Sequence, residues 1–160
     1  MENLDKLYSV MSEELEIYKS MASNAAEKRR YLIENNIPKI SEFTAKEEQL
    51  ISLAREKETE KNRILGEIFG NGGSVKNVTE ILKIAPPQYK KLFEDCRVHI
   101  NRVIAKIKDE NNKNSMIINQ CLQFIDFNLQ FLSGDNYSNS IYSGKAKKHA
   151  SRLSLLDRKF

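Results

Sequence analysis

The sequence contains few of the residues that form turns, bind metals or catalyse reactions. Its 160 residues include no tryptophan, three prolines, six glycines, two cysteines and two histidines. Scarce glycine and proline leave long stretches without turn signals, which favours long helices over many short strands. Hydrophobic residues make up 40% of the chain and charged residues 30%, a balance typical of amphipathic helices. We therefore predict an elongated, all-α protein with one main domain.

Patterns for catalysis or ligand binding are missing too. The glycine-rich segment 70–73 is followed by neither the Lys-Ser/Thr pair nor the parallel-sheet pattern of a phosphate-binding loop. His99 and His149 have no Glu or His at the three- or four-residue spacing of a helical metal site. Carboxylates mostly stand near lysines and arginines, as on solvated helix faces. We expect no catalytic residue, no cofactor and no metal.

Cysteine usage and hydropathy bear on the compartment. Cys96 and Cys121 lie in apolar stretches without metal-type spacing, so we expect both to be reduced core residues. The polar start, Met1-Glu2-Asn3, lacks the features of a secretory signal. The most apolar stretch, 116–132, is too short and too polar to span a bilayer. These features predict a cytoplasmic protein without membrane insertion.

The net charge of +4 is concentrated at one end. Residues 133–160 carry six basic and two acidic residues, while residues 1–132 carry 20 of each. A balanced body offers no electrostatic surface for nucleic acid, and so small a basic patch would bind it only weakly and nonspecifically. The tail is rich in Ser, Asn and Lys, a composition typical of a flexible arm. We predict a helical domain over 1–132, a flexible basic tail over 133–160 and no nucleic-acid partner.

Apolar spacing predicts three long helices and one short helix, over 4–34, 38–69, 75–83 and 87–132. The first has apolar residues at alternating steps of four and three, interrupted at Arg29. Asn35 to Pro38 separates it from an antiparallel second helix, whose charged middle, 55–63, can bury little. Gly70 to Gly73 and Pro86-Pro87 bound the short helix, with Ser74 as its cap. The stripe of the first helix is Leu4, Tyr8, Met11, Leu15, Tyr18, Ala22, Ala25 and Leu32.

The last helix continues the four-three pattern with a polar step. Its seam changes from apolar residues to Glu110 and Asn114, which we expect to set the register, and then becomes apolar again. The apolar seam residues are Tyr89, Phe93, Cys96, Ile100, Val103 and Ile107 before this step, and Ile117, Cys121, Phe124 and Phe131 after it.

The segment 116–132 is more apolar than one helix contact requires, with 11 apolar residues of 17. Several helices could enclose it, but the sequence supplies only two other long helices and one of these has a charged middle. An apolar face left over would suit capture of an amphipathic partner helix, or self-association. The predicted binding residues are Ile117, Ile118, Cys121, Leu122, Phe124, Ile125, Phe127, Leu129, Phe131 and Leu132.

Ordered motifs along the chain resemble the FlgN family of flagellar export chaperones. The last helix has an NxxN pair, Asn111 and Asn114, followed by the paired aliphatics Ile117-Ile118 and then by Gln120-Cys121-Leu122 and Phe124-Ile125. The second helix has Thr44, Glu47, Leu50-Ile51 and an ExxR step from Glu60 to Arg63. The glycine-rich break, short helix and prolines follow in the family's order.

The resemblance implies a chaperone that holds hook-filament junction proteins unassembled and delivers them to the flagellar type III export gate. It implies that residues 117–132 bind the helical C-terminal segments of these clients. It also implies that Tyr142, shortly before Gly144, contacts the cytosolic domain of the gate, with Tyr137 as the other candidate. The alternative is a structural coiled-coil or adaptor protein that self-associates, for example as a homodimer, through the same apolar face.

Overall fold

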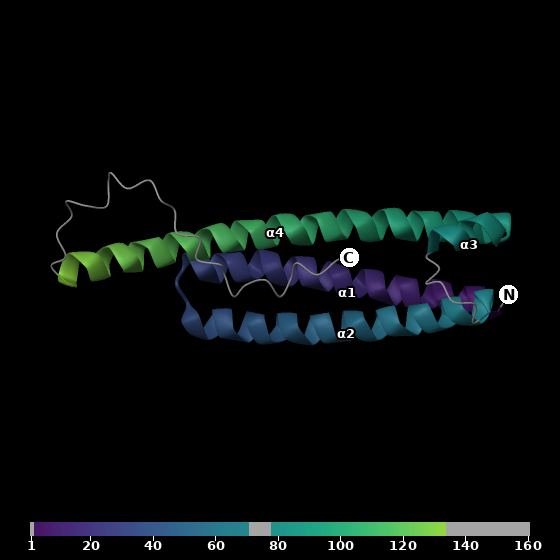
Figure 1. Ribbon diagram of the computed structural model, residues 1–160, viewed down its shortest axis with the longest axis horizontal. Helices are drawn as coiled ribbons and strands as arrows, with labels where there is room; N and C mark the ends of the chain where they lie inside the picture. The colour runs from purple at the N-terminus through teal and green to yellow at the C-terminus, as the bar shows by residue number, and fades with distance from the viewer. Residues whose placement is uncertain (1, 71–77, 134–160) are drawn as a thin grey trace. The chain divides into compact units, whose positions relative to one another are not determined.

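The computed structural model describes residues 2–70 and 78–133, and its described residues are almost entirely helical (Figure 1). The helices are α1 (Glu2–Ile33), α2 (Ile37–Phe69), α3 (Val78–Ile84) and α4 (Pro87–Ser133). The predicted all-α class, with three long helices and a short one, is confirmed. The described part of the short helix begins at Val78, and residues 75–77 together with Ser74, the predicted cap, lie outside the described residues.

Two adjacent asparagines make the turn between α1 and α2. Asn35 has a φ of 51°, a left-handed conformation that asparagine tolerates better than most residues. The Asn36 N–H donates to the carbonyl of Tyr31 at 3.0 Å, and the Asn35 N–H donates to that of Leu32 at 3.3 Å. The Asn36 Oδ1 then accepts from the Lys39 N–H at 3.2 Å and caps α2. This tight turn makes α1 and α2 antiparallel (Figure 1).

Helix α1 has packing partners on two sides. It contacts α2 through the ion pair between Glu14 and Lys61, and it contacts α4 through the backbone carbonyl of Ala25, which accepts a hydrogen bond from the Asn114 side-chain amide. A single stripe therefore does not describe its buried face. Four residues outside the predicted stripe are buried as well: Leu7, Val10, Glu14 and Asn24.

A buried carboxylate on α1 corrects the expectation that the acidic residues lie on solvated faces. Glu14 is 2% exposed and accepts hydrogen bonds from Lys61 Nζ at 2.7 Å and from the Tyr18 hydroxyl at 3.0 Å. Burial and the Glu14 carboxylate raise the pKa of Tyr18 above its ordinary value of 10.0, because both disfavour a second negative charge. The network ties α1 to the charged middle of α2, where no residue from 55 to 63 is buried.

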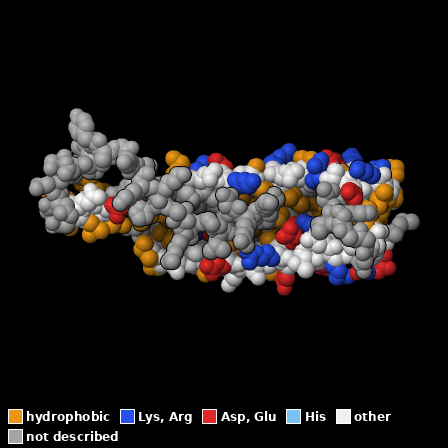
Figure 2. All heavy atoms as spheres, in the orientation of Figure 1, with side chains coloured by type: hydrophobic (Ala, Val, Ile, Leu, Met, Phe, Trp, Pro, Cys, Tyr) orange, Lys and Arg blue, Asp and Glu red, His pale blue; other side chains and the backbone are white. Residues whose placement is uncertain are grey.

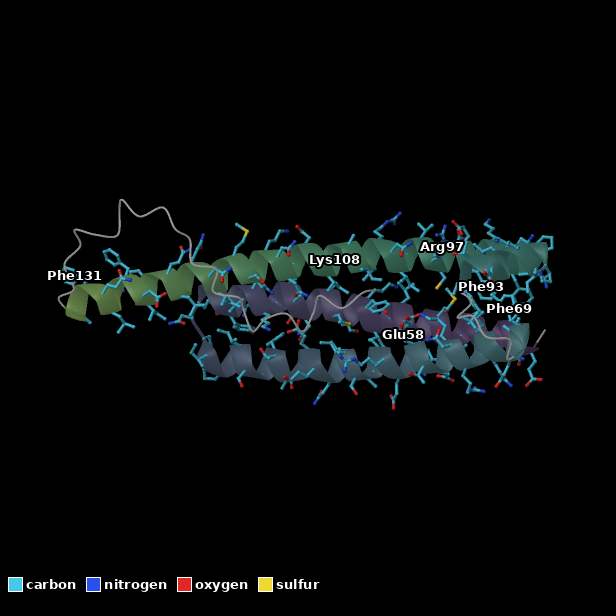
Figure 3. All side chains as sticks on the ribbon, in the orientation of Figure 1. Glu58, Phe69, Phe93, Arg97, Lys108 and Phe131 are labelled. Atoms are coloured by element: carbon cyan, nitrogen blue, oxygen red, sulfur yellow. The ribbon has the colours of Figure 1, made fainter. Side chains whose placement is uncertain are left out.

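The apolar core lies at the α3 end of the bundle. Phe93 is 0% exposed and meets the Tyr8 ring edge-on, with ring centroids 6.3 Å apart, while the Tyr89 hydroxyl donates to Asp5 at 2.6 Å. Cys96 is buried as predicted, and burial raises the pKa of its thiol. Figure 3 labels Phe93 in this region. The buried cluster comprises Leu7, Val10, Met11, Ile64, Leu65, Ile81, Ala85, Tyr89, Phe93 and Cys96.

The structure divides into two compact units between Leu122 and Gln123, within α4. The hydrogen bond from Asn114 to Ala25 sets the register between α1 and α4, which run in the same direction (Figure 1). Helix α1 continues from Ala25 only to Ile33, about 12 Å at 1.5 Å per residue. An equal length of α4 reaches Leu122, so the first unit ends where α1 does.

Candidate binding surface

Asn24 and Asn114 form a polar layer in the bundle, just before the predicted binding residues of α4 begin. Asn24 Nδ2 donates to the Phe43 carbonyl at 3.0 Å, and Asn114 Nδ2 donates to the Ala25 carbonyl at 2.9 Å. Both asparagines are buried, and within the described residues the Oδ1 atom of each lacks a hydrogen-bond partner. The layer therefore fixes register through two directed bonds rather than through apolar area.

The polar interruptions of the two helical stripes meet each other. Arg29, which breaks the stripe of α1, forms an ion pair with Glu110, which breaks that of α4. From residue 97 to residue 132, the buried side chains of α4 are Glu110 and Asn114 alone. Little fully buried apolar area therefore holds this half of α4 against α1, in contrast to the core around Phe93.

Beyond the polar layer, α4 presents apolar side chains to solvent. Phe124 is 68% exposed, Phe131 72% and Leu132 79%, whereas Ile117 is half-buried. Cys121 is exposed, so the expectation that it is a core residue is wrong; it lies in the last turn of the first unit, where α1 ends. The other exposed apolar residues here are Met116, Ile118, Leu122, Ile125, Phe127 and Leu129. We call the predicted binding residues between Ile117 and Leu132 the apolar strip.

The apolar strip carries almost no charge. Between residues 116 and 132, Asp126 is the one charged residue of the sequence. Asn128 lies among the apolar residues, but its Nδ2 donates to the Phe124 carbonyl of its own helix at 2.8 Å. In Figure 2, hydrophobic side chains appear at the surface toward the end of α4, while charged side chains spread over the three-helix region. The strip thus offers apolar contact with few polar groups to desolvate.

The exposed area is large for a single helix. Nine large apolar residues from Met116 to Leu132 are between 37% and 79% exposed, which amounts to roughly 1,000 Å² if a fully exposed side chain presents about 200 Å². A typical monomer has a largest apolar patch of only a few hundred Å², and a standard interface takes about 800 Å² from each partner. Figure 3 labels Phe131 in this region. The strip is large enough for a specific protein interface.

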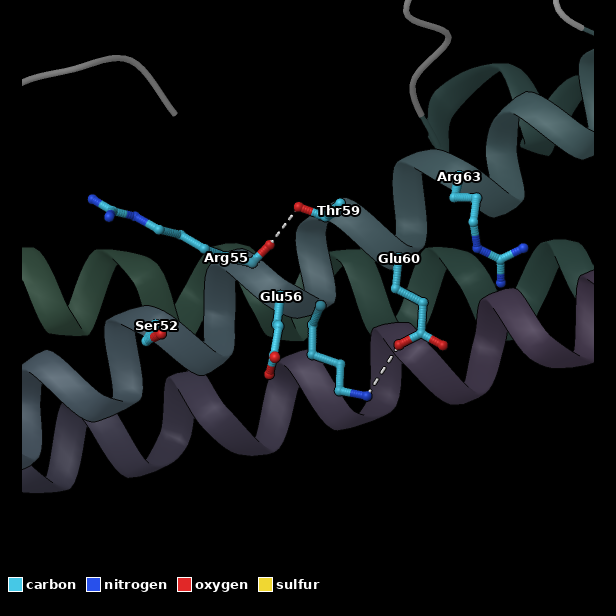
Figure 4. Close-up of a pocket in the computed structure, with 7 residues that line it drawn as sticks. Ser52, Arg55, Glu56, Thr59, Glu60 and Arg63 are labelled. Carbon is cyan, nitrogen blue, oxygen red and sulfur yellow. Dashed lines mark hydrogen bonds and ion pairs between the residues drawn. The ribbon is translucent and has the colours of Figure 1, made fainter.

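A hollow on the charged middle of α2 offers weaker grounds for a site. Thr59 Oγ1 donates to the Arg55 carbonyl at 2.9 Å, and Lys57 pairs with Glu60 at 3.1 Å (Figure 4). The residues that line it all belong to α2 and carry mixed charges. Lys57 also pairs with Glu13 of α1 at 2.6 Å, so the positive charge of Lys57 is compensated within the protein.

Neither a metal site nor a membrane-spanning helix is found among the described residues. No group of three His, Cys, Asp or Glu within 2–70 and 78–133 is placed to hold a metal ion. None of the described helices is sufficiently long and apolar to cross a membrane. The predicted gate contacts, Tyr142 and Tyr137, lie outside the described residues.

Comparison with known protein families decides the identity. Residues 1–150 match the family described as FlgN protein. The chain belongs to the FlgN family. It is accordingly a flagellar export chaperone and acts in flagellar assembly, and the family is one of chaperones rather than enzymes. A search of curated proteins and a search of solved structures each returned no match.

Several FlgN motif residues make contacts between the helices of the bundle. Asn114, the second asparagine of the NxxN pair, is buried and bonded to the Ala25 carbonyl, and Asn111 is half-buried one turn earlier. In α2, Glu47 pairs with Lys28 of α1 at 2.8 Å. The second asparagine of the NxxN pair therefore ties α4 to α1 immediately before the apolar strip begins.

Proposed function

We propose that the apolar strip of this FlgN protein binds the helical C-terminal segments of hook-filament junction proteins and prevents their premature assembly. The observation that carries the proposal is the exposure of Phe124, Phe131 and Leu132 on α4. An amphipathic client helix that lays its apolar face on these residues would remove them from water. Because such client segments assemble with one another, their apolar faces must stay covered until export.

The chemistry of the strip suits reversible capture. Aromatic side chains such as Phe124 and Phe131 bring large contact areas at a small cost in side-chain entropy, as at binding hot spots. The one charge, Asp126, leaves few groups whose desolvation would oppose binding. Contact without covalent chemistry allows the client to be released to the export apparatus.

We further propose that the chaperone works in the cytoplasm and hands its clients to the cytosolic domain of the export gate through Tyr142. The motif of a tyrosine shortly before Gly144, in the tail beyond Ser133, supports this role. Substituting Tyr142→Ala should leave client affinity unchanged and weaken binding to the purified gate domain. Unchanged gate affinity would assign the contact to another residue, with Tyr137→Ala as the next variant.

The test of client binding uses purified hook-filament junction protein and isothermal titration calorimetry. We expect Phe124→Asp to weaken binding by about a hundredfold or more, because a carboxylate would be buried against apolar surface. Circular dichroism should show unchanged helix content, since Phe124 is exposed. Asn119→Asp is the matched control, because it adds the same charge to an exposed position of the same helix.

Two outcomes would reject the proposal. If the wild type and Phe124→Asp bound the client with equal affinity, the apolar strip would not be the client-binding surface. A stable oligomer of the free wild type, detected by light scattering and dissociated by Phe124→Asp, together with no client binding, would instead establish the self-associating adaptor.

A further inference from the structure

The end of α4 is apolar around more of its circumference than one partner helix can cover. Successive helical residues lie about 100° apart, so Phe124 and Ile125 project in different directions although both are exposed. A face that packs on one neighbour is usually a little over 100° wide. Five exposed apolar residues of the second unit spread over roughly 160° at this spacing: Phe124, Ile125, Leu129, Phe131 and Leu132.

Two separate four-three seams account for this width. The first continues the bundle seam beyond Asn114 through Ile117, Cys121, Phe124, Asn128 and Phe131. The second, which we call the aliphatic seam, begins at Ile118 about 100° around the helix and keeps the same alternation of four and three. Its members are Ile118, Leu122, Ile125, Leu129 and Leu132, with exposed fractions of 37%, 52%, 50%, 59% and 79%.

The residue types of the aliphatic seam favour more than two helices. The step of four from Ile118 to Leu122 places isoleucine at heptad position d and leucine at position a, and the next pair, Ile125 and Leu129, repeats this order. In parallel coiled coils, leucine at a with isoleucine at d shifts the preference from dimers to trimers and tetramers. The seam is therefore suited to a bundle in which α4 meets at least two neighbours.

The flanks of the aliphatic seam argue against a second copy of this chain as its occupant. In the same register, Asp126 falls at position e, while Cys121 and Asn128 fall at position g. Paired copies would find no basic residue opposite the Asp126 carboxylate, so no e–g ion pair would specify the match. A partner helix with Lys or Arg at that flank would complement the seam.

We propose that the end of α4 binds two helices of one client chain at the same time. One helix packs along Phe124 and Phe131, and the second packs along the aliphatic seam with a basic residue facing Asp126. This inference rests on the proposed function and deepens it, because it specifies the client segment as a pair of amphipathic helices. The client helix that packs along the aliphatic seam carries a large aliphatic residue at every third or fourth position.

The experiment compares Phe124→Asp with Ile125→Asp, adjacent substitutions of the same charge on different seams, and uses Gln123→Asp, at an exposed position outside both seams, as control. Each full-length chaperone is mixed with intact hook-filament junction protein. Affinity is measured by calorimetry, complex mass by light scattering, and protection of the client by limited proteolysis with mass spectrometry. The wild type should form a complex of one chaperone and one client and protect two separate client helices.

We expect Ile125→Asp to weaken binding at least about tenfold and to expose one of the two protected client helices while the other stays protected. Reversal of the flank charge, Asp126→Lys, should weaken binding several-fold at low salt and less at high salt, because the lost attraction is screened. Gln123→Asp should match the wild type in both affinity and protection.

The outcomes separate failure of this inference from failure of the proposed function. If Phe124→Asp disrupts binding but Ile125→Asp leaves affinity and protection unchanged, the client uses one helix and the inference falls while the proposed function stands. A complex that contains two chaperones, or tighter binding by Asp126→Lys, would also overturn it. Unchanged client binding by Phe124→Asp, whatever the result for Ile125→Asp, would reject the proposed function itself.

Discussion

The buried ion pair between Glu14 and Lys61 allows a prediction whose sign depends on which partner is removed. The Glu14 side chain is 2% exposed, whereas that of Lys61 is 19% exposed. Substituting Lys61→Met keeps the apolar stem but leaves a buried carboxylate without its cation. Loss of one partner of a fully buried pair costs about 3–5 kcal/mol. Because solvent reaches Lys61 and the Tyr18 hydroxyl still donates to Glu14, we expect about 2–3 kcal/mol here.

The reverse substitution should cost less. In Glu14→Met the Lys61 ammonium can turn toward water, so we expect a loss of about 1 kcal/mol, from the Tyr18 hydroxyl bond and imperfect packing. The double variant should lie within about 1 kcal/mol of the wild type, because an apolar pair of similar volume replaces a desolvated ion pair. The cycle would thus show strong coupling between two residues 47 positions apart.

Urea unfolding followed by circular dichroism measures all four proteins, with the slope against urea checked for constancy. If Glu14→Met destabilised the protein as much as Lys61→Met does, burial of the carboxylate would not be the controlling factor. A double variant as unstable as Lys61→Met would likewise refute the reasoning.

Three further predictions concern stability. Phe93→Ala should lower the free energy of unfolding by about 3–5 kcal/mol in urea titration, since the ring is fully buried; a loss below 1 kcal/mol, on the order of a surface change, would contradict its central place. Asn114→Leu should be neutral or stabilising by about 1 kcal/mol, because it removes a buried Oδ1 without a described partner while the Ala25 carbonyl keeps its helical bond; marked destabilisation would show that the amide bond matters more. The raised pKa of Tyr18 contributes stability that is complete below its ordinary pKa of 10.0 and is lost as pH rises through the folded value. Tyr18→Phe should therefore show a smaller fall in melting temperature between about pH 9 and pH 11 than the wild type, and equal falls would contradict the assignment.

The helical architecture was predictable because local signals agree along the chain. The apolar steps of α1, the turn at Asn35 and Asn36 and the prolines before α4 act within a few residues, so no knowledge of tertiary contacts was needed. The burial of Leu7, Val10 and Asn24 was missed because the single stripe assumed one neighbour, whereas α1 has two. A widened stripe can be recognised only once the number of neighbouring helices is known.

The site was predictable in outline but not residue by residue. The excess of apolar residues in 116–132 indicated a surface, and the exposure of Phe124 and Phe131 agrees with that reasoning; their role in client binding stays a proposal. Cys121 was misjudged because hydropathy does not reveal the register between α1 and α4, and so does not show that Cys121 lies where α1 ends. Glu14 was misjudged because its cationic partner, Lys61, lies 47 positions away in the sequence, so the residues around Glu14 do not reveal the ion pair.

The uneven distribution of apolar burial along α4 has a dynamic consequence. Its first turns join the cluster around Phe93, whereas its later turns have only Glu110 and Asn114 buried. Amide hydrogen exchange should accordingly be slowest near Phe93 and should accelerate toward Leu132, because less cooperative structure must open to expose the later amides. The beginning of α4 would stay packed while its last turns open, so these turns would adjust to a bound client without loss of the core around Phe93.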